Sequence, residues 1–142
     1  YVPSYMEEYP HLIDGPGLQM ISSGEGKLLM TVIADQKTKI DALDSGFSSR
    51  QYYDYVAARV GDKMKLSKIY TPYTDSIRNL SFIQGQVRGE LQGEPTIYTI
   101  RTIETASYYF QIAIWMEEKC ELDSIIRSDL QHILDSFEPL QE

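Results

Sequence analysis

Alternation of apolar and polar side chains along residues 64–117 constrains the fold of this chain more than any other feature. Successive side chains of a strand point to opposite faces of the sheet, so a period of two predicts strands rather than helices. Four candidate strands span residues 64–71, 80–91, 96–104 and 108–117. The breaks at residues 92–95 and 105–107 are short enough for hairpins. Consecutive strands joined in this way form a mainly antiparallel sheet.

Two further strands are predicted ahead of this region, at residues 18–22 and 27–34. The spacer between them, Ser-Gly-Glu-Gly, is typical of a hairpin. The second strand is apolar on both faces, which predicts a central position in the sheet. Residues 1–17 contain several prolines and glycines and are predicted to be an irregular N-terminal segment or linker. Residues 18–142 then form a single domain.

Two amphipathic helices complete the pattern. The first is expected near residues 48–60, because Ser48 and Gln51 have the spacing of a capping box and Gly61 is suited to a left-handed C-terminal cap. The second is expected at residues 121–137, ahead of Pro139. The order β-β-α-β-β-β-β-α predicts an α+β fold, in which about six strands form a mainly antiparallel sheet and two helices cover one face or both.

The last candidate strand separates its side chains clearly by face. One face is predicted to belong to the core and carries Tyr108, Phe110, Ile112, Ile114 and Met116. The other face is mixed and is predicted to be partly wet or covered by another element. Gly85 and Gly89 share one face of an earlier strand, and we expect them to allow a helix to lie close to the sheet.

The charge of the chain argues against nucleic acid as a partner. The 142 residues carry a net charge of −8, and acidic side chains dominate both ends. Residues 27–101 contain 11 basic and 8 acidic side chains, too small and too dispersed an excess to displace counterions from a nucleic acid. No stretch has the ~20 apolar residues of a membrane span, and no signal peptide is recognisable. The first residue is Tyr1 rather than methionine, so we expect a processed product or a piece of a longer protein.

No group of residues has the spacing of a catalytic or metal site. His11 and His132 are the only histidines, and Cys120 is the only cysteine. The loop with Asp35, Asp41 and Asp44 lacks the ligand spacing of an EF-hand, and adjacent carboxylates at the end of the last strand point to opposite faces. We therefore expect no catalytic residue, metal or cofactor, and the sequence favours a non-enzymatic role.

The chain is rich in tyrosine, with 11 in 142 residues. Tyr and Trp are favoured at recognition surfaces because they bury a large area with few torsions. Four aromatic residues are not obviously claimed by the core pattern. They are the candidates for a binding surface: Tyr55, Tyr73, Tyr109 and Trp115.

The closing part of the chain resembles a known family. An aromatic-rich strand, Tyr108-Tyr109-Phe110-Gln111-Ile112, precedes a terminal helix that ends Ile133-Leu134-Asp135-Ser136-Phe137. Together with the element order, this is similar to the PsbP/Mog1-type α/β fold over most of residues 18–138. That family includes extrinsic subunits of photosystem II, a Ran-binding nuclear import factor and many bacterial exported proteins. The resemblance implies a non-enzymatic domain that binds another protein, but no binding residue of the family has a counterpart in this sequence.

These observations predict an accessory domain that acts through protein–protein interaction, as the soluble part of a larger or exported protein. A protein partner and an extracytoplasmic bacterial location are expected. One alternative is a small-molecule carrier or enzyme on a curved, cystatin-like or nuclear-transport-factor-like sheet, with a cavity lined by Tyr98, Ile100 and Trp115. Another alternative is an acidic dimer of the secretion-chaperone kind.

Overall fold

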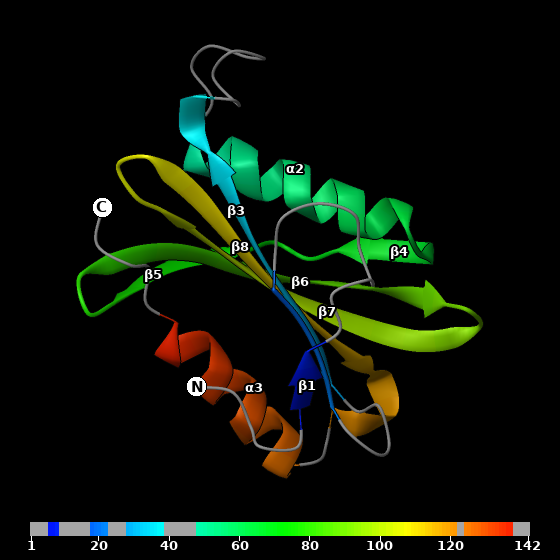
Figure 1. The fold of residues 1–142 in the computed structure, drawn as a ribbon. Helices are drawn as coiled ribbons and strands as arrows, with labels where there is room; N and C mark the ends of the chain where they lie inside the picture. The colour runs from blue at the N-terminus through cyan, green and yellow to red at the C-terminus, as the bar shows by residue number, and fades with distance from the viewer. Residues whose placement is uncertain (1–5, 9–17, 23–27, 39–47, 122–123, 138–142) are drawn as a thin grey trace.

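The computed structural model describes residues 6–8, 18–22, 28–38, 48–121 and 124–137. Their strands form one antiparallel sheet in the order β1-β2-β3-β8-β7-β6-β4, with β5 also paired to β6. The helices α2 and α3 lie on opposite faces of this sheet, which gives three layers (Figure 1). The elements are β1 (Met6–Glu8), β2 (Leu18–Ser22), β3 (Leu29–Gln36), α2 (Ser49–Asp62), β4 (Lys65–Ile69), β5 (Tyr73–Ile77), β6 (Leu80–Leu91), β7 (Glu94–Glu104), β8 (Tyr108–Glu117), η1 (Glu118–Cys120) and α3 (Ser124–Ser136). The predicted α+β fold and the predicted order of strands and helices are confirmed.

Strands β6, β7 and β8 are the longest and form a continuous meander. The turn between β6 and β7 needs only Gln92 and Gly93, whose φ angles of 53° and 83° are those of a tight I′-type hairpin. Strand β7 therefore begins at Glu94, two residues earlier than the alternation indicated.

Two short strands add to the six that the sequence predicts. Strand β5 precedes β6 through a hairpin at Arg78 and Asn79, with φ angles of 49° and 64°. Its central residue Asp75 has weak strand preference, and the strand is short, so the sequence did not predict it. Strand β1 lies inside the segment expected to be irregular and pairs with β2.

Helix α2 begins with the predicted capping box. Ser48 Oγ accepts the backbone N–H of Gln51, and the Gln51 side chain accepts the backbone N–H of Ser48. The helix continues to Asp62, and Gly61 is inside it rather than in a left-handed cap. A Cβ on Gly61 would lie 3.4 Å from Ser67 Oγ, so the glycine lets β4 pass close to the end of the helix.

One core cluster lies between α2 and the sheet. This α2 cluster is aromatic and consists of Tyr52, Tyr53, Val56, Ala57, Val60, Met64, Ile83, Val87, Tyr98, Ile100, Tyr109 and Ala113. Gly85 lies directly beneath Tyr53, and a Cβ there would collide with the Tyr53 hydroxyl. Gly85 thus leaves room for a side chain of α2, as predicted, whereas the prediction is wrong for Gly89, where a Cβ would meet Met64 and β4 instead of a helix. The mixed face of β8 is the face that α2 covers.

A second core cluster lies between α3 and the sheet. This α3 cluster is mainly aliphatic and consists of Leu28, Met30, Phe82, Ile97, Ile103, Ile112, Ile114, Met116, Ile126, Ile133 and Leu134. It contains three of the five side chains predicted for the core face of β8, with Phe110 packed at its border. Helix α3 begins later than expected, because the short turn η1 follows β8 first.

A buried arginine fastens the end of α3 to the sheet. Arg101 is 1% exposed and donates to Gln84 Oε1 at 2.7 Å and to the Leu134 carbonyl at 3.0 Å. Its guanidinium also pairs with Asp135 at 3.1 Å and stacks on Phe82, 3.7 Å from the ring centroid. The cation thus meets the carbonyl end of the helix, where positive charge is favoured.

Candidate functional site

Exposed apolar side chains gather in one part of the described structure. Most of the large hydrophobic side chains exposed there come from one short stretch of sequence. They are Leu66, Ile69, Tyr70 and Tyr73, on or beside β4 and β5, whereas Tyr55 and Ile125 lie on the helices. We call these four residues, together with Lys65 and Lys68, the β4–β5 edge. A clustered apolar patch of this kind marks an interaction site more often than scattered exposed residues do.

The β4–β5 edge is a border of the sheet. Strands β4 and β5 pair with successive parts of β6, on the side away from β7, and no described strand pairs with their outer side. Tyr70 donates its backbone N–H to the Gln86 carbonyl at 3.0 Å. Backbone groups of successive strand residues point to alternate sides, so those of Ile69 point away from β6. The backbone groups of Ile69 are therefore the ones that a further strand would pair with at this border.

A bulge shapes this border at Leu66. Lys65 faces Glu90 and Lys68 faces Arg88, so Leu66 and Ser67 together stand opposite the single residue Gly89. A Cβ on Gly89 would lie 3.0 Å from the Lys65 carbonyl oxygen, so the bulge requires a glycine there. Leu66 has a φ of 53° and is 83% exposed. A leucine in the left-handed region is strained, and its side chain is presented to solvent.

The same border is basic. Residues 63–74 contain three lysines and no acidic side chain. Lys68 Nζ lies 4.9 Å from the ring centroid of Tyr70, and the Arg88 guanidinium lies 5.5 Å from it. Arg88 also donates to both carboxylate oxygens of Glu121, which raises the pKa of the arginine further. The aromatic ring of Tyr70 is thus framed by cations.

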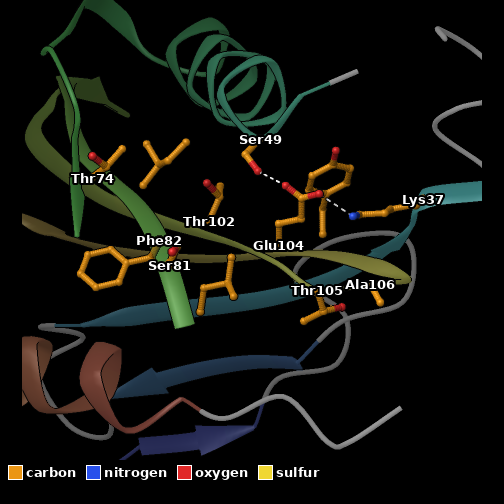
Figure 2. Close-up of a pocket in the computed structure, with 12 residues that line it drawn as sticks. Lys37, Ser49, Thr74, Ser81, Phe82, Thr102, Glu104, Thr105 and Ala106 are labelled. Atoms are coloured by element: carbon orange, nitrogen blue, oxygen red, sulfur yellow. Dashed lines mark hydrogen bonds and ion pairs between the residues drawn. The ribbon is translucent and has the colours of Figure 1, made fainter. Parts of the chain in front are cut away.

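A pocket of about 560 Å³ opens at the start of α2, beside Ser49. Its volume is in the range of small-molecule sites. Figure 2 shows it between the start of α2, strand β5 and the hairpin that joins β7 and β8. The lining residues are Lys37, Ser49, Thr74, Ser81, Phe82, Ile83, Thr102, Ile103, Glu104, Thr105, Ala106 and Tyr109. Hydroxyl groups dominate the polar part of this lining.

Glu104 is the central charged group of the pocket. Its carboxylate accepts hydrogen bonds from Lys37 Nζ and from Ser49 Oγ, as Figure 2 shows. The bond from Lys37, and then that from Ser49, lowers the pKa of Glu104 below its ordinary value of 4.5. Lys37 also lies over the ring of Tyr109, 5.2 Å from its centroid. Because the cation and the anion are paired, the pocket attracts neither sign of charge strongly.

Beside the pocket, a tyrosine pair joins α2 to the sheet. The rings of Tyr52 and Tyr109 stack with their centroids 4.6 Å apart. The Tyr52 hydroxyl donates to Asp35 Oδ2 at 2.5 Å and accepts from Gln111 Nε2 at 3.3 Å. Burial, and then the bond to Asp35, raises the pKa of Tyr52 far above its ordinary value of 10.0. The hydroxyl therefore stays protonated and acts as a structural donor.

The four aromatic residues predicted for a binding surface do not lie together. Tyr73 is on the β4–β5 edge, and Tyr55 is exposed on α2, where its hydroxyl accepts from Arg59 at 3.2 Å. Tyr109 is 3% exposed and belongs to the α2 cluster, and Trp115 stacks on Tyr98 at 5.2 Å between centroids.

The small-molecule alternative places a cavity beside Tyr98, Ile100 and Trp115, and none of these residues lines the pocket around Glu104. The side chains of Tyr98 and Ile100 are buried in the α2 cluster. The sequence reasoning also missed Leu66, Ile69 and Tyr70. Their signal in the sequence is a run of lysines and large apolar residues without an acid, in a strand that is exposed at all five of its residues.

Two negative findings apply to the described ranges only. They contain no group of three or more His, Cys, Asp or Glu side chains placed to hold a metal ion. None of their helices is long and apolar enough to cross a bilayer.

Two solved structures share the fold. One is the crystal structure of PA94, a protein of unknown function from Pseudomonas aeruginosa, with a TM-score of 0.56 and 10% identity over 98% of this chain and 100% of that chain. The other is LpqN, involved in cell envelope biogenesis of Mycobacterium tuberculosis, with a TM-score of 0.58 and 8% identity over 91% of this chain and 76% of that chain. No family model and no curated protein sequence matches the chain. At these identities the likeness establishes an α/β fold in common.

Proposed function

We propose that this domain is a non-enzymatic accessory module that binds another protein through the β4–β5 edge. The observation that carries the proposal is the concentration of exposed Leu66, Ile69, Tyr70 and Tyr73 on one border of the sheet. Exposing these side chains to water is unfavourable, and burying them against a partner would remove that cost. Tyrosines next to aliphatic anchors are typical of the residues that contribute most to protein interfaces.

The charge of the molecule supports a protein rather than a polyanion as the partner. The chain carries a net charge of −8, which repels nucleic acid and anionic lipid at long range. This cluster of positive charge is confined to the β4–β5 edge. It therefore attracts an acidic region of a protein there, while the rest of the surface does not bind anionic partners non-specifically. The predicted absence of nucleic-acid binding is part of this proposal.

Membership of the PsbP/Mog1-type family and an extracytoplasmic location belong to the same proposal. The family proposal is supported by the sequence resemblance in residues 108–112 and 133–137, and the α/β fold shared with PA94 and LpqN is compatible with it. The location is proposed because LpqN is involved in cell envelope biogenesis. In this reading the domain is the soluble, partner-binding part of an exported protein.

Photocrosslinking tests the proposal. The photoreactive residue p-benzoylphenylalanine would replace Tyr70 in one variant and Gln131, exposed on α3, in a matched control. Irradiated cells of the source organism should yield one adduct, identified by mass spectrometry, with the position 70 variant and none with the position 131 variant. An equal adduct from both positions, or none from position 70 although the protein is folded and abundant, would refute the proposal.

A second candidate function, small-molecule binding, is favoured by the pocket around Glu104. Its hydroxyl groups both donate and accept hydrogen bonds, and its charges are paired, so an uncharged ligand with hydroxyl or amide groups fits best. Thermal-shift measurements against a panel of such compounds test it, with Thr102→Val as the pocket variant. A shift that is the same in both proteins would exclude the pocket as the site.

A further inference from the structure

The bulge at Leu66 strains the backbone, and no packing of the Leu66 side chain within the fold offsets this strain. A leucine with φ at 53° is strained by about 1–2 kcal/mol. Its side chain is 83% exposed, so packing does not compensate. Residues held in strained backbone conformations are concentrated at functional sites in many proteins. The bulge therefore indicates that the position of this side chain serves an interaction.

The backbone of β4 specifies the kind of partner. The strand is exposed at all five residues, and the N–H and C=O of Ile69 point outward. An extended segment that pairs with such a border satisfies these groups and continues the sheet. The exposed run from Lys65 to Tyr70 matches the length of a typical strand of five or six residues.

The charge of β4 specifies the composition of that segment. Lys65 and Lys68 form no ion pair with another described residue, whereas Arg88 is engaged by Glu121. Opposite charges facing each other across neighbouring strands stabilise the pair, and like charges destabilise it. A segment that carries carboxylates opposite the lysines is favoured over a basic or neutral one.

We infer that β4 binds an acidic, extended segment of a partner protein as an added strand, with Leu66 as its apolar anchor. This inference rests on the proposed function and names the chemistry and the mode of binding at the same border. The occupant is a segment of another protein rather than a second copy of this chain.

Peptide selection tests the composition. A library of random eight-residue linear peptides would be selected on the immobilised full chain, and the most enriched peptide would be labelled with fluorescein for anisotropy titration. We expect enrichment of peptides that alternate β-branched and acidic residues, with a Kd that rises at least fivefold between 50 and 200 mM salt, roughly the loss from two or three ion pairs. Enrichment without acidic residues, or an affinity that ignores salt, would refute the inference.

Substitutions at the bulge test the anchor and separate binding from stability. Leu66→Asn accepts the left-handed backbone, so the midpoint of thermal unfolding should rise by about 3 °C. The same variant should bind the selected peptide at least tenfold more weakly. Lys65→Glu/Lys68→Glu should also weaken binding at least tenfold, whereas the charge-matched control Arg50→Glu/Arg127→Glu should leave it within twofold. Unchanged binding by Leu66→Asn would show that the bulge is only structural and would overturn the inference.

The outcomes distinguish this inference from the function on which it rests. An adduct at position 70, combined with selected peptides that are not acidic, would leave the proposed function standing and reject the mode. The wild-type chain could also sediment as a dimer that the Leu66→Asn substitution dissociates. That result would identify a second copy of the chain as the occupant and would reject this inference as well. Selected peptides that bind the edge variants and the wild type equally would reject the edge altogether.

Discussion

The two faces of the sheet hold their helices by different means. On one face α2 lies over aromatic rings and a glycine, and Tyr53 fits above Gly85. On the other face α3 packs on aliphatic side chains, and Arg101 bonds to its last turn. The Tyr53 side chain, for which Gly85 leaves room, holds the first helix, and the charged side chain of Arg101 holds the second.

This difference bears on function because, of the two helices, α2 is the one that touches both candidate surfaces. Ser49, at the start of α2, lines the pocket and bonds to Glu104, and the chain passes from the end of α2 directly into β4. Helix α3 is the cover of the other face. We therefore expect changes beneath α3, other than at the pocket residues Phe82 and Ile103, to affect stability alone, and changes beneath α2 to affect stability together with one of the two surfaces.

The largest effect is expected for Arg101→Met. The change removes the cation and the donor to the Leu134 carbonyl and to Gln84, while Asp135 keeps its bond from Gln131, and unpairing of the buried polar groups costs about 3 kcal/mol. Urea denaturation should show this loss, and amide hydrogen exchange should show α3 losing protection before α2. Arg127→Met, on the exposed side of α3, is the control and should change stability by less than about 0.5 kcal/mol. Equal loss of protection in both helices would contradict the separate attachment of the two faces.

Gly85→Ala is expected to have the next largest effect. The added methyl would collide with the Tyr53 hydroxyl and approach Pro72 at 3.1 Å, so overpacking should cost about 2 kcal/mol. Tyr53→Phe alone should be neutral or slightly stabilising, because the buried hydroxyl has no hydrogen-bond partner among the described residues. In the double variant part of the cost should be recovered, and a double-mutant cycle measures that coupling. A coupling of zero would show that α2 does not rest on Gly85 through this ring.

These particular residues also show how far the sequence leads. The start of α2 could be predicted because Ser48 and Gln51 form a capping box within one turn. The long strands could be predicted because the alternation of residues 80–117 depends only on neighbouring positions in the sequence. Burial depends on which layer lies above a residue, so Tyr109 was expected to be available although α2 covers it. The edge was missed for the same reason, since the bulge at Leu66 exists only when Gly89 pairs across from it. Local patterns do not contain that pairing.

Tyr52→Phe compares a satisfied hydroxyl with the unsatisfied one on the next residue. The Tyr52 hydroxyl bonds to Asp35 and Gln111, and its removal should cost about 1 kcal/mol in urea denaturation. Because burial raises the pKa of Tyr52, its absorbance should titrate only at alkaline pH that unfolds the protein. A cost equal to that of Tyr53→Phe would mean that the hydrogen bonds beneath α2 contribute nothing beyond the ring stacking.

The smallest effect is expected for Glu104→Gln, which tests whether the pocket cluster ties α2 to the sheet. The pKa of Glu104 is lower in the folded protein, so its contribution is present above the unfolded value of about 4.5 and is lost as the pH falls through the folded value. Because the carboxylate is partly exposed, the free energy of unfolding of the wild type should exceed that of the variant by only about 0.5 kcal/mol at pH 7. That difference should disappear in acid below the folded pKa. Glu94→Gln, exposed at the opposite end of β7, is the matched control, and its free energy of unfolding should follow that of the wild type in both conditions. A difference between wild type and Glu104→Gln that persists in acid would assign the effect to packing at the start of α2 instead of to charge.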